Sequence, residues 1–393
     1  MDHLHLRLRT LFDGTEKLVE NVDVKIAGGR IVAVGADLPV ERDAAVIEAP
    51  FGMPGFIDAH THLALAPVRE GPGPHPTVPF IAARQAREKL ASGVTTVRDV
   101  GGIDHIDIEL RNAIRRGDVL GPRMLVAGRF VCPTGGHCHY FAHEADGPEE
   151  VRKAARTQMK AGSDIVKIMV SGGVSNVSEP PERLYMDDSE VRAAVHEAHE
   201  AGRRVAAHVH PAKGIKMCAD AGVDTIEHGA WLDDEAIDAI LAAGAAVIPT
   251  EAVYYRLAGG NDPHYAELAA VAQRVTKEKS ARLSHAIERG IKIGVGTDCG
   301  RHYPYDDFVS ELVYLQAAGM TPLQVLAAAT SGNAAIIGLD DRIGTIAPGM
   351  AADMILMDGN PVDDLSAAGA VTTVIQGGRP MPVDAIRMRG AVI

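Results

Sequence analysis

The segment Asp58-Ala59-His60-Thr61-His62 contains the first residues whose types and spacing could bind a metal. On a β-strand, residues two positions apart point to the same side, so the two imidazoles could hold one ion. The spacing alone is a weak signal, because the chain contains four His-x-His pairs and they cannot all serve one site. Position strengthens the signal, since His60 and His62 end an apolar run that follows Pro54-Gly55, where we expect the functional end of a sheet.

Lys167 lies inside the apolar run from Asp164 to Val170, where an unpaired ammonium would be costly. One interpretation is a salt bridge to a carboxylate on a neighbouring strand. The other is a carboxylated lysine, whose carbamate turns the buried cation into an anionic oxygen ligand that can bridge two metals. Taken alone, the lysine favours the salt bridge, but the residues that end the later apolar runs reverse this preference.

Three further residues of metal-binding type, His208, His228 and Asp298, end later apolar runs. Each also has a simpler explanation. His208 could be a hydrogen-bonded core histidine, His228 a loop residue, and Asp298 the N-cap of a following helix. A single metal centre that also includes the two histidines and the lysine above explains all of these positions at once.

Short apolar runs alternate with stretches of helical period through the middle of the chain, which is typical of βα units and a parallel sheet. Eight such units over residues 55–344 fit a (β/α)8 TIM barrel better than a doubly wound sheet, because metal-binding residue types recur at the carboxyl ends of the runs. The predicted strands are Gly55 to His62, Val94 to Gly101, Arg123 to Ala127, Asp164 to Val170, Arg204 to His210, Thr225 to Ala230, Ala246 to Thr250 and Lys292 to Asp298. The predicted helices include Glu149 to Ala161, Asp188 to Ala201, Ile215 to Ala221 and Val271 to Arg289.

The two ends of the chain are β-rich and differ from the middle. Val22 to Ile26 and Arg30 to Val34 read as strands around a glycine turn, and Gly344 to Met357 and Val371 to Arg379 repeat this style. We therefore expect residues 1–54 and 345–393 to form one small composite β domain. Two irregular loops are expected above the functional face, Pro67 to Pro79 and Gly259 to His264.

The composition limits the classes of partner. The net charge is −13 and the isoelectric point is near 5.7, so the chain lacks the basic surface of nucleic-acid-binding proteins. No window approaches the ~18 apolar residues of a membrane span, and the N-terminus has no apolar signal core. Four sparse cysteines predict reduced thiols. We expect a cytoplasmic protein with a small-molecule partner and neither nucleic acid nor membrane.

A set of motifs spans almost the whole chain: PGFIDAHTH, TTVRDVGG, TGGH, IVKIMVSGG, AAHVH, TIEHG, GVGTD and GTIAPGMAADMIL. On these motifs the chain resembles the amidohydrolase superfamily, and within it the imidazolonepropionase-like and metal-dependent dipeptidase (prolidase-like) branch. The resemblance implies a hydrolase of C–N bonds and implies that the small domain is a β-sandwich. Barrels of this kind often self-associate, so we expect a homo-oligomer.

The same resemblance implies two divalent metal ions. One ion would be held by His60, His62, Lys167 and Asp298, and the other by Lys167, His208 and His228, with Lys167 carboxylated. This mixture of nitrogen and oxygen ligands suits Zn²⁺, although Mn²⁺ or Co²⁺ could substitute. A metal-activated bridging hydroxide would attack the carbonyl, and Asp298 would act as general base and pass the proton to the leaving nitrogen.

Two departures from related enzymes bear on the reaction. Mononuclear deaminases of the superfamily typically have an acidic residue three positions after the strand-5 histidine and lack the bridging lysine. Here Pro211 occupies that position and Lys167 is present, which favours binuclear hydrolysis. The dipeptidases often have tyrosine two positions after that histidine, where this chain has His210. His210 could take a catalytic role by polarising the carbonyl, or it could only support the site.

The candidate substrate-binding residues follow the predicted strands 3, 7 and 8: His137, Tyr254, Tyr255, Arg301 and His302. His137 is also a candidate catalytic residue, whereas the two tyrosines could instead pack against the rim of the barrel. Arg301 and His302 could bind a substrate carboxylate. A dipeptide or N-acyl amino acid is therefore the expected substrate. A non-peptide amide, carbamate, urea, lactam or organophosphate in the same centre remains an alternative, as does a non-catalytic scaffold.

Overall fold

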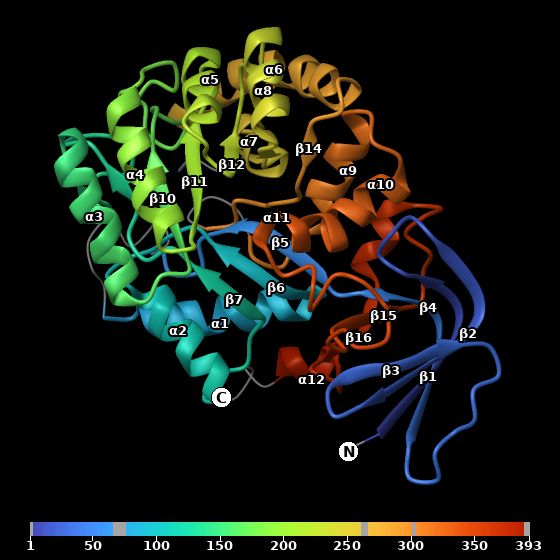
Figure 1. The fold of residues 1–393 in the computed structure, drawn as a ribbon. Helices are drawn as coiled ribbons and strands as arrows, with labels where there is room; N and C mark the ends of the chain where they lie inside the picture. The colour runs from blue at the N-terminus through green and yellow to red at the C-terminus, as the bar shows by residue number, and fades with distance from the viewer. Residues whose placement is uncertain (1–2, 66–75, 261–265, 301–303, 389–393) are drawn as a thin grey trace.

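The computed structural model describes residues 3–65, 76–260, 266–300 and 304–388 (Figure 1). Arg301 and His302 lie outside these residues, as do most of the loop predicted from Pro67 and much of the loop predicted from Gly259. Val78 and Pro79, placed in the first loop by the sequence, begin a helix instead, since proline suits the first turn of a helix. None of the described helices is long and apolar enough to cross a membrane.

Each of the eight predicted apolar runs contains a strand, although most of the strands are shorter than predicted. They are β5 (Phe56–Thr61), β6 (Val94–Asp99), β7 (Arg123–Val126), β10 (Ile165–Met169), β11 (Arg204–Val209), β12 (Thr225–His228), β13 (Ala246–Ile248) and β14 (Lys292–Ile293). Two short strands, β8 (Val131–Cys132) and β9 (His143–Glu144), add to them. All pairings among these strands are parallel, so the prediction of a parallel α/β fold is confirmed.

The parallel strands form two sheets, one ordered β5-β6-β7 and the other β14-β13-β12-β11-β10-β8-β9. Individual backbone hydrogen bonds connect the sheets at both junctions. Asp164 N–H donates to the carbonyl of Val126 at 2.7 Å, and Ala59 N–H donates to that of Val295 at 2.9 Å. The strand ladders themselves do not run continuously around the described residues, so a fully closed barrel remains a prediction.

Helices lie outside the parallel strands (Figure 1). They are α1 (Val78–Ala91), α2 (Ile106–Arg116), α3 (Gly147–Ala161), α4 (Asp188–Glu200), α5 (Ala212–Asp220), α6 (Asp234–Ala243), α7 (Glu251–Ala258), α8 (Ala266–Glu288), α9 (Val309–Ala317), α10 (Pro322–Ala327) and α11 (Asn333–Ile337). Local signals set their ends: α4 begins with a capping box between Asp187 and Glu190, and α3 ends at Gly162, whose φ of 109° is left-handed.

Strands from the two ends of the chain share one mixed sheet. Its order is β17 (Arg379–Pro382), β16 (Val371–Gln376), β15 (Met354–Met357), β4 (Ala45–Pro54), β1 (His3–Phe12), β2 (Leu18–Ala27) and β3 (Arg30–Gly35). A separate apolar cluster that includes Leu6, Val24 and Ile375 packs in this region, and α12 (Val383–Met388) follows β17. The two facing sheets of a β-sandwich are not confirmed, and the domain boundaries remain predictions.

In the segment from Gly344 to Met357, where the sequence indicates strands and Gly/Pro turns, only Met354–Met357 is a strand. Gly344 and Gly349 have φ of 94° and 93°, which are left-handed conformations that break an extended chain. The preceding residues therefore form turns that lead into β15.

A buried ion pair connects a helix to the strands beneath the carboxyl end of β5. The Lys89 ammonium on α1 lies 2.8 Å from the Asp58 carboxylate, and both side chains are fully buried. Asp58 also accepts hydrogen bonds from the backbone and hydroxyl of Thr297, at 3.0 and 2.7 Å. A paired and hydrogen-bonded buried charge is tolerated, whereas removing one partner leaves an uncompensated charge.

We predict that Lys89→Met destabilises the protein by about 3–5 kcal/mol, because Asp58 then stays buried without its cation. The matched control is Lys216→Met, which breaks the exposed pair with Asp220 and should change stability much less, because solvent screens an exposed pair. Urea unfolding of both variants gives the comparison. Equal losses in the two variants would show that the Lys89 pair has no special structural weight.

Candidate metal centre

A pocket lies at the carboxyl ends of the parallel strands and encloses about 700 Å³, part of it open to solvent. It brings together residues from both parallel sheets, which the sequence places far apart. Most of the predicted site residues line it: His60, His62, His137, Lys167, His208, His228, Tyr254 and Asp298.

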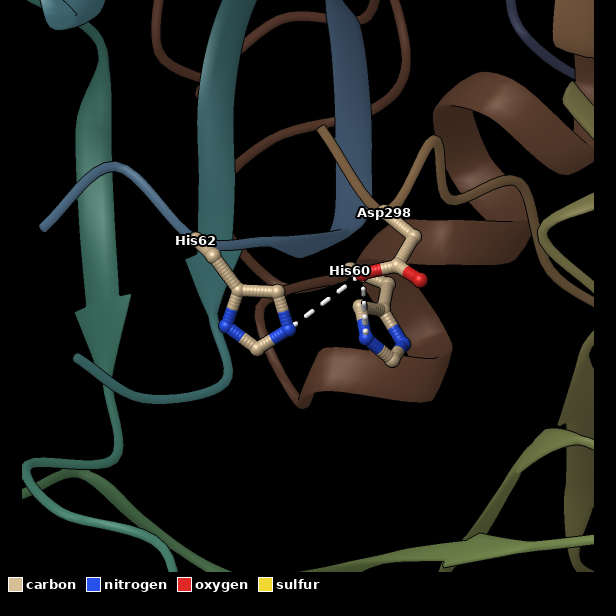
Figure 2. Close-up of side chains that lie close together, drawn as sticks. All are labelled: His60, His62 and Asp298. Atoms are coloured by element: carbon tan, nitrogen blue, oxygen red, sulfur yellow. Dashed lines mark ion pairs between the residues drawn. The ribbon is translucent and has the colours of Figure 1, made fainter. Parts of the chain in front are cut away.

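His60, His62 and Asp298 form the tightest group of potential metal ligands in the described residues (Figure 2). Asp298 Oδ1 lies 3.4 Å from His60 Nε2 and 3.3 Å from His62 Nε2. Backbone hydrogen bonds hold the two segments in register, since Asp298 N–H donates to His60 O and His62 N–H donates to Cys299 O, both at 2.8 Å. Desolvation opposes ionisation of Asp298, but the two histidines outweigh it and hold its pKa well below the usual range.

Each of the four histidines predicted as metal ligands is held at one ring nitrogen by a hydrogen-bond partner. The contacts are His60 Nδ1 to Glu227 at 2.6 Å, His62 Nδ1 to Gly101 O at 2.8 Å, His208 Nε2 to Gly172 O at 2.9 Å, and His228 Nδ1 to Thr250 Oγ1 at 2.7 Å. A carbonyl accepts only from a protonated nitrogen, so the second nitrogen of His62 and of His208 carries a lone pair when the ring is neutral. Such second contacts orient metal-binding histidines.

Burial also keeps two of these rings neutral. Desolvation lowers the pKa of His208 and of His228 well below the ordinary value, and the neighbouring histidines and Lys167 add to the effect. Neutral imidazole is the form that binds metal, so the environment suits both rings to be ligands.

Lys167 is buried in the middle of β10, and its ammonium has no hydrogen-bond or ion-pair partner among the described residues. Burial lowers its pKa to about 8, although Glu227 and Asp298 oppose this shift. The first interpretation of Lys167, a salt bridge to a carboxylate on a neighbouring strand, is therefore wrong for the described residues. An unpaired buried amine is costly, and its neutral form is a nucleophile that can be carboxylated.

His137 lies beside the ring of His208, stacked at 4.4 Å with an interplanar angle of 23°. Its Nδ1 is 2.6 Å from the buried carboxylate of Glu179, which also accepts a hydrogen bond from Asn176 at 2.7 Å. Burial alone would lower the pKa of His137, but Cys138 and Glu179 outweigh it and raise the pKa to about 10. The pocket therefore contains a fixed cation near neutral pH.

The remaining candidate residues divide into those at the pocket and those away from it. Tyr254 is buried in the pocket wall, and its hydroxyl lies 3.4 Å from Nε2 of His210. His210 is buried behind this tyrosine and does not itself line the pocket. Tyr255 stacks on Tyr314 at 4.1 Å, outside the pocket.

The sequence analysis did not identify the residues that hold these side chains in place: Arg98, Glu179, Glu227 and Thr250. Glu227 had a usable signal, because it is polar within a buried strand and shares a face with Thr225 two positions earlier. In the structure it contacts Arg98 at 2.8 Å, and although burial opposes ionisation, Arg98 and His60 lower its pKa. Glu179 lies in an irregular segment, where no periodic pattern predicts burial.

Comparisons with known proteins agree with this geometry. A family model described as "Amidohydrolase family" matches residues 51–381. Ochratoxinase from Aspergillus niger is 29% identical over 413 residues, which cover 94% of this chain and 84% of the relative. A solved Xaa-Pro dipeptidase with bound methionine is 30% identical, with a TM-score of 0.90 over 97% of this chain and 100% of that one. A putative prolidase from Bifidobacterium longum is 31% identical, with a TM-score of 0.85 over 100% of this chain and 99% of the other.

We predict that Glu179→Gln flattens the pH dependence of stability. The raised pKa of His137 means that its pairing stabilises the fold fully below pH 6.5, and that this contribution is lost as the pH rises toward about 10. Urea midpoints of metal-free protein should therefore fall more steeply across this window in the wild type than in the variant. An exposed control, Glu149→Gln, should follow the wild type. Parallel curves for wild type and Glu179→Gln would contradict the charged pair.

Proposed function

Since the chain belongs to the Amidohydrolase family and is a hydrolase of carbon–nitrogen bonds, we propose that it is a metal-dependent amidohydrolase acting on a dipeptide or N-acyl amino acid. The observation that carries the proposal is the buried Lys167 ammonium, which has no partner among the described residues and lies in a pocket with His208 and His228, each hydrogen-bonded at one ring nitrogen. No anion among the described residues pairs with this ammonium. Carboxylation would convert Lys167 into an anionic oxygen ligand, and bound metal ions would then balance its charge.

The proposed ligands fall into two sets that share Lys167. One set is His60, His62, Asp298 and carboxylated Lys167, and the other is Lys167, His208 and His228. The free ring nitrogens and the ionised Asp298 support this assignment, because metal ligands must be deprotonated. The nitrogen and oxygen donors suit Zn²⁺, and Mn²⁺ or Co²⁺ could also fit.

When bound, two such metals lower the pKa of a water and polarise the scissile carbonyl. The residues of the chain would supply the remaining steps. Asp298, held ionised beside His60 and His62, takes the proton of the attacking water and transfers it to the leaving nitrogen. The cation of His137, fixed by Glu179, faces the same pocket and offers a hydrogen-bond donor to the substrate oxygen or to a carboxylate.

The walls of the pocket support a substrate with an apolar part. Leu65, Phe130, Phe141, Val253 and Leu257 line it beside the polar centre. An apolar wall with a few placed charges is the common pattern of small-molecule sites. The similarity to a solved Xaa-Pro dipeptidase adds support for a dipeptide substrate.

The finer architecture is part of the same proposal. We infer that the two parallel sheets form one (β/α)8 barrel, with the terminal strands as a β-sandwich beside it. The hydrogen bonds at both junctions between the sheets support the barrel, as does the similarity to solved structures at TM-scores near 0.90. Active sites of such barrels lie at the carboxyl ends of the strands, where this pocket lies.

The test combines metal analysis with an activity panel on protein purified from cells grown with zinc and bicarbonate. We expect about two metals per chain in the wild type, fewer in Lys167→Ala, and hydrolysis of dipeptides or N-acyl amino acids by the wild type only. The control is Lys216→Ala, an exposed lysine, which should keep the wild-type metal content.

Two results would contradict the proposal in different ways. Folded wild-type protein without metal would remove the hydrolytic mechanism and favour a non-catalytic scaffold. Metal-loaded protein that cleaves only a carbamate, urea, lactam, organophosphate or non-peptide amide would keep the centre and replace the substrate class.

A further inference from the structure

Thr250 lies where β13 leads into α7, and its backbone is left-handed, with φ of 54° and ψ of 48°. The side chain is completely buried. A β-branched residue rarely adopts this conformation, because its Cβ substituents crowd the backbone. Glycine or asparagine would fit this backbone with less strain, so the presence of threonine requires another reason.

Capping of the helix does not supply that reason. Threonine before a helix usually accepts a hydrogen bond from an amide in the first turn, but the Thr250 side chain makes no such bond. The buried carboxylate of Glu311 on α9 takes this role, since it accepts from the amides of Glu251 at 3.0 Å and Ala252 at 2.7 Å. The Thr250 hydroxyl is therefore available for other contacts.

The hydroxyl has two partners. It donates to the carbonyl of Pro249 at 2.7 Å, because a carbonyl oxygen can only accept. Its lone pair then accepts from Nδ1 of His228, also at 2.7 Å. These two hydrogen bonds place the ring proton of His228 on Nδ1 and leave a lone pair on Nε2 of this pocket-lining residue.

A buried ion pair between α8 and α7 holds the other end of this hydrogen-bond chain. Lys279 on α8 donates to the same Pro249 carbonyl and pairs with Glu251 on α7 at 2.6 Å. The ammonium also lies 4.3 Å from the centre of the Tyr254 ring, in the pocket wall. The oxygen that receives the Thr250 proton is therefore fixed, and the hydroxyl has one preferred direction.

We propose that Thr250 is a positioning residue that fixes the orientation and tautomer of His228 for metal binding. This inference rests on the proposed metal-dependent function. The strained backbone brings the hydroxyl to the histidine, and Glu311 replaces the lost helix cap. We therefore expect that threonine at position 250 does not stabilise the metal-free protein. Removal of its hydroxyl should lower the affinity for metal.

The experiment measures apparent zinc affinity by chelator competition and the melting temperature of the metal-free full-length protein. Thr250→Val keeps the shape and strain but removes the oxygen, Thr250→Gly removes both, and Thr250→Ser keeps the oxygen. We expect zinc affinity to fall about 10- to 100-fold in the Val and Gly variants and to change less than threefold in the Ser variant. The metal-free Gly variant should melt at or above the temperature of the Val variant.

Thr96→Val is the matched control, because Thr96 on β6 is as fully buried as Thr250, but its hydroxyl has no hydrogen-bond partner among the described residues. It should keep wild-type zinc affinity. If Thr250→Val does not fold, the Ser and Gly variants still compare sites with and without the oxygen. Wild-type affinity in Thr250→Val or Thr250→Gly would overturn the inference alone, whereas absence of zinc binding by the wild type would overturn it together with the proposed function.

Discussion

The hydrogen bond from His60 to the buried Glu227 carboxylate, and the equivalent bonds at His62, His208 and His228, determine what this pocket can do. A neutral ring that donates a hydrogen bond through one nitrogen keeps a lone pair on its other nitrogen. Gly101, Gly172 and Thr250 follow strands adjacent to those of their histidines, whereas Glu227 lies on β12, which does not pair with β5. The parallel strands therefore orient these histidines as well as carry them.

The distribution of buried charge separates structural groups from chemical ones. Lys89 pairs with Asp58, and Arg98 pairs with Glu227, so these cations are compensated within the fold. Lys167 is equally buried but has no partner in the described residues. An uncompensated buried amine is unfavourable. The position of Lys167 beside neutral histidines therefore favours the proposal that carboxylation and bound metal compensate it. The family membership of the chain agrees with this interpretation.

The strands could be predicted from the sequence, because they depend on a local pattern, and the same pattern indicated residues that the structure brings to one pocket. His60, His62, Lys167, His208, His228 and Asp298 each end or interrupt an apolar run, and the ends of parallel strands meet at one edge. The residues that hydrogen-bond to the pocket histidines and orient them were not predictable in the same way. Glu179 acts from an irregular segment and Thr250 from a left-handed turn, and neither position follows from residue type or periodicity.

The most direct test of the proposed two-metal centre is a crystal structure of protein purified from cells grown with zinc and bicarbonate. Anomalous diffraction would be measured at the zinc edge. We expect two anomalous peaks. One lies between His60, His62 and Asp298, the other between His208 and His228, and electron density extends from the Lys167 amine to both. A bare Lys167 side chain with no anomalous peak near these histidines would contradict the account.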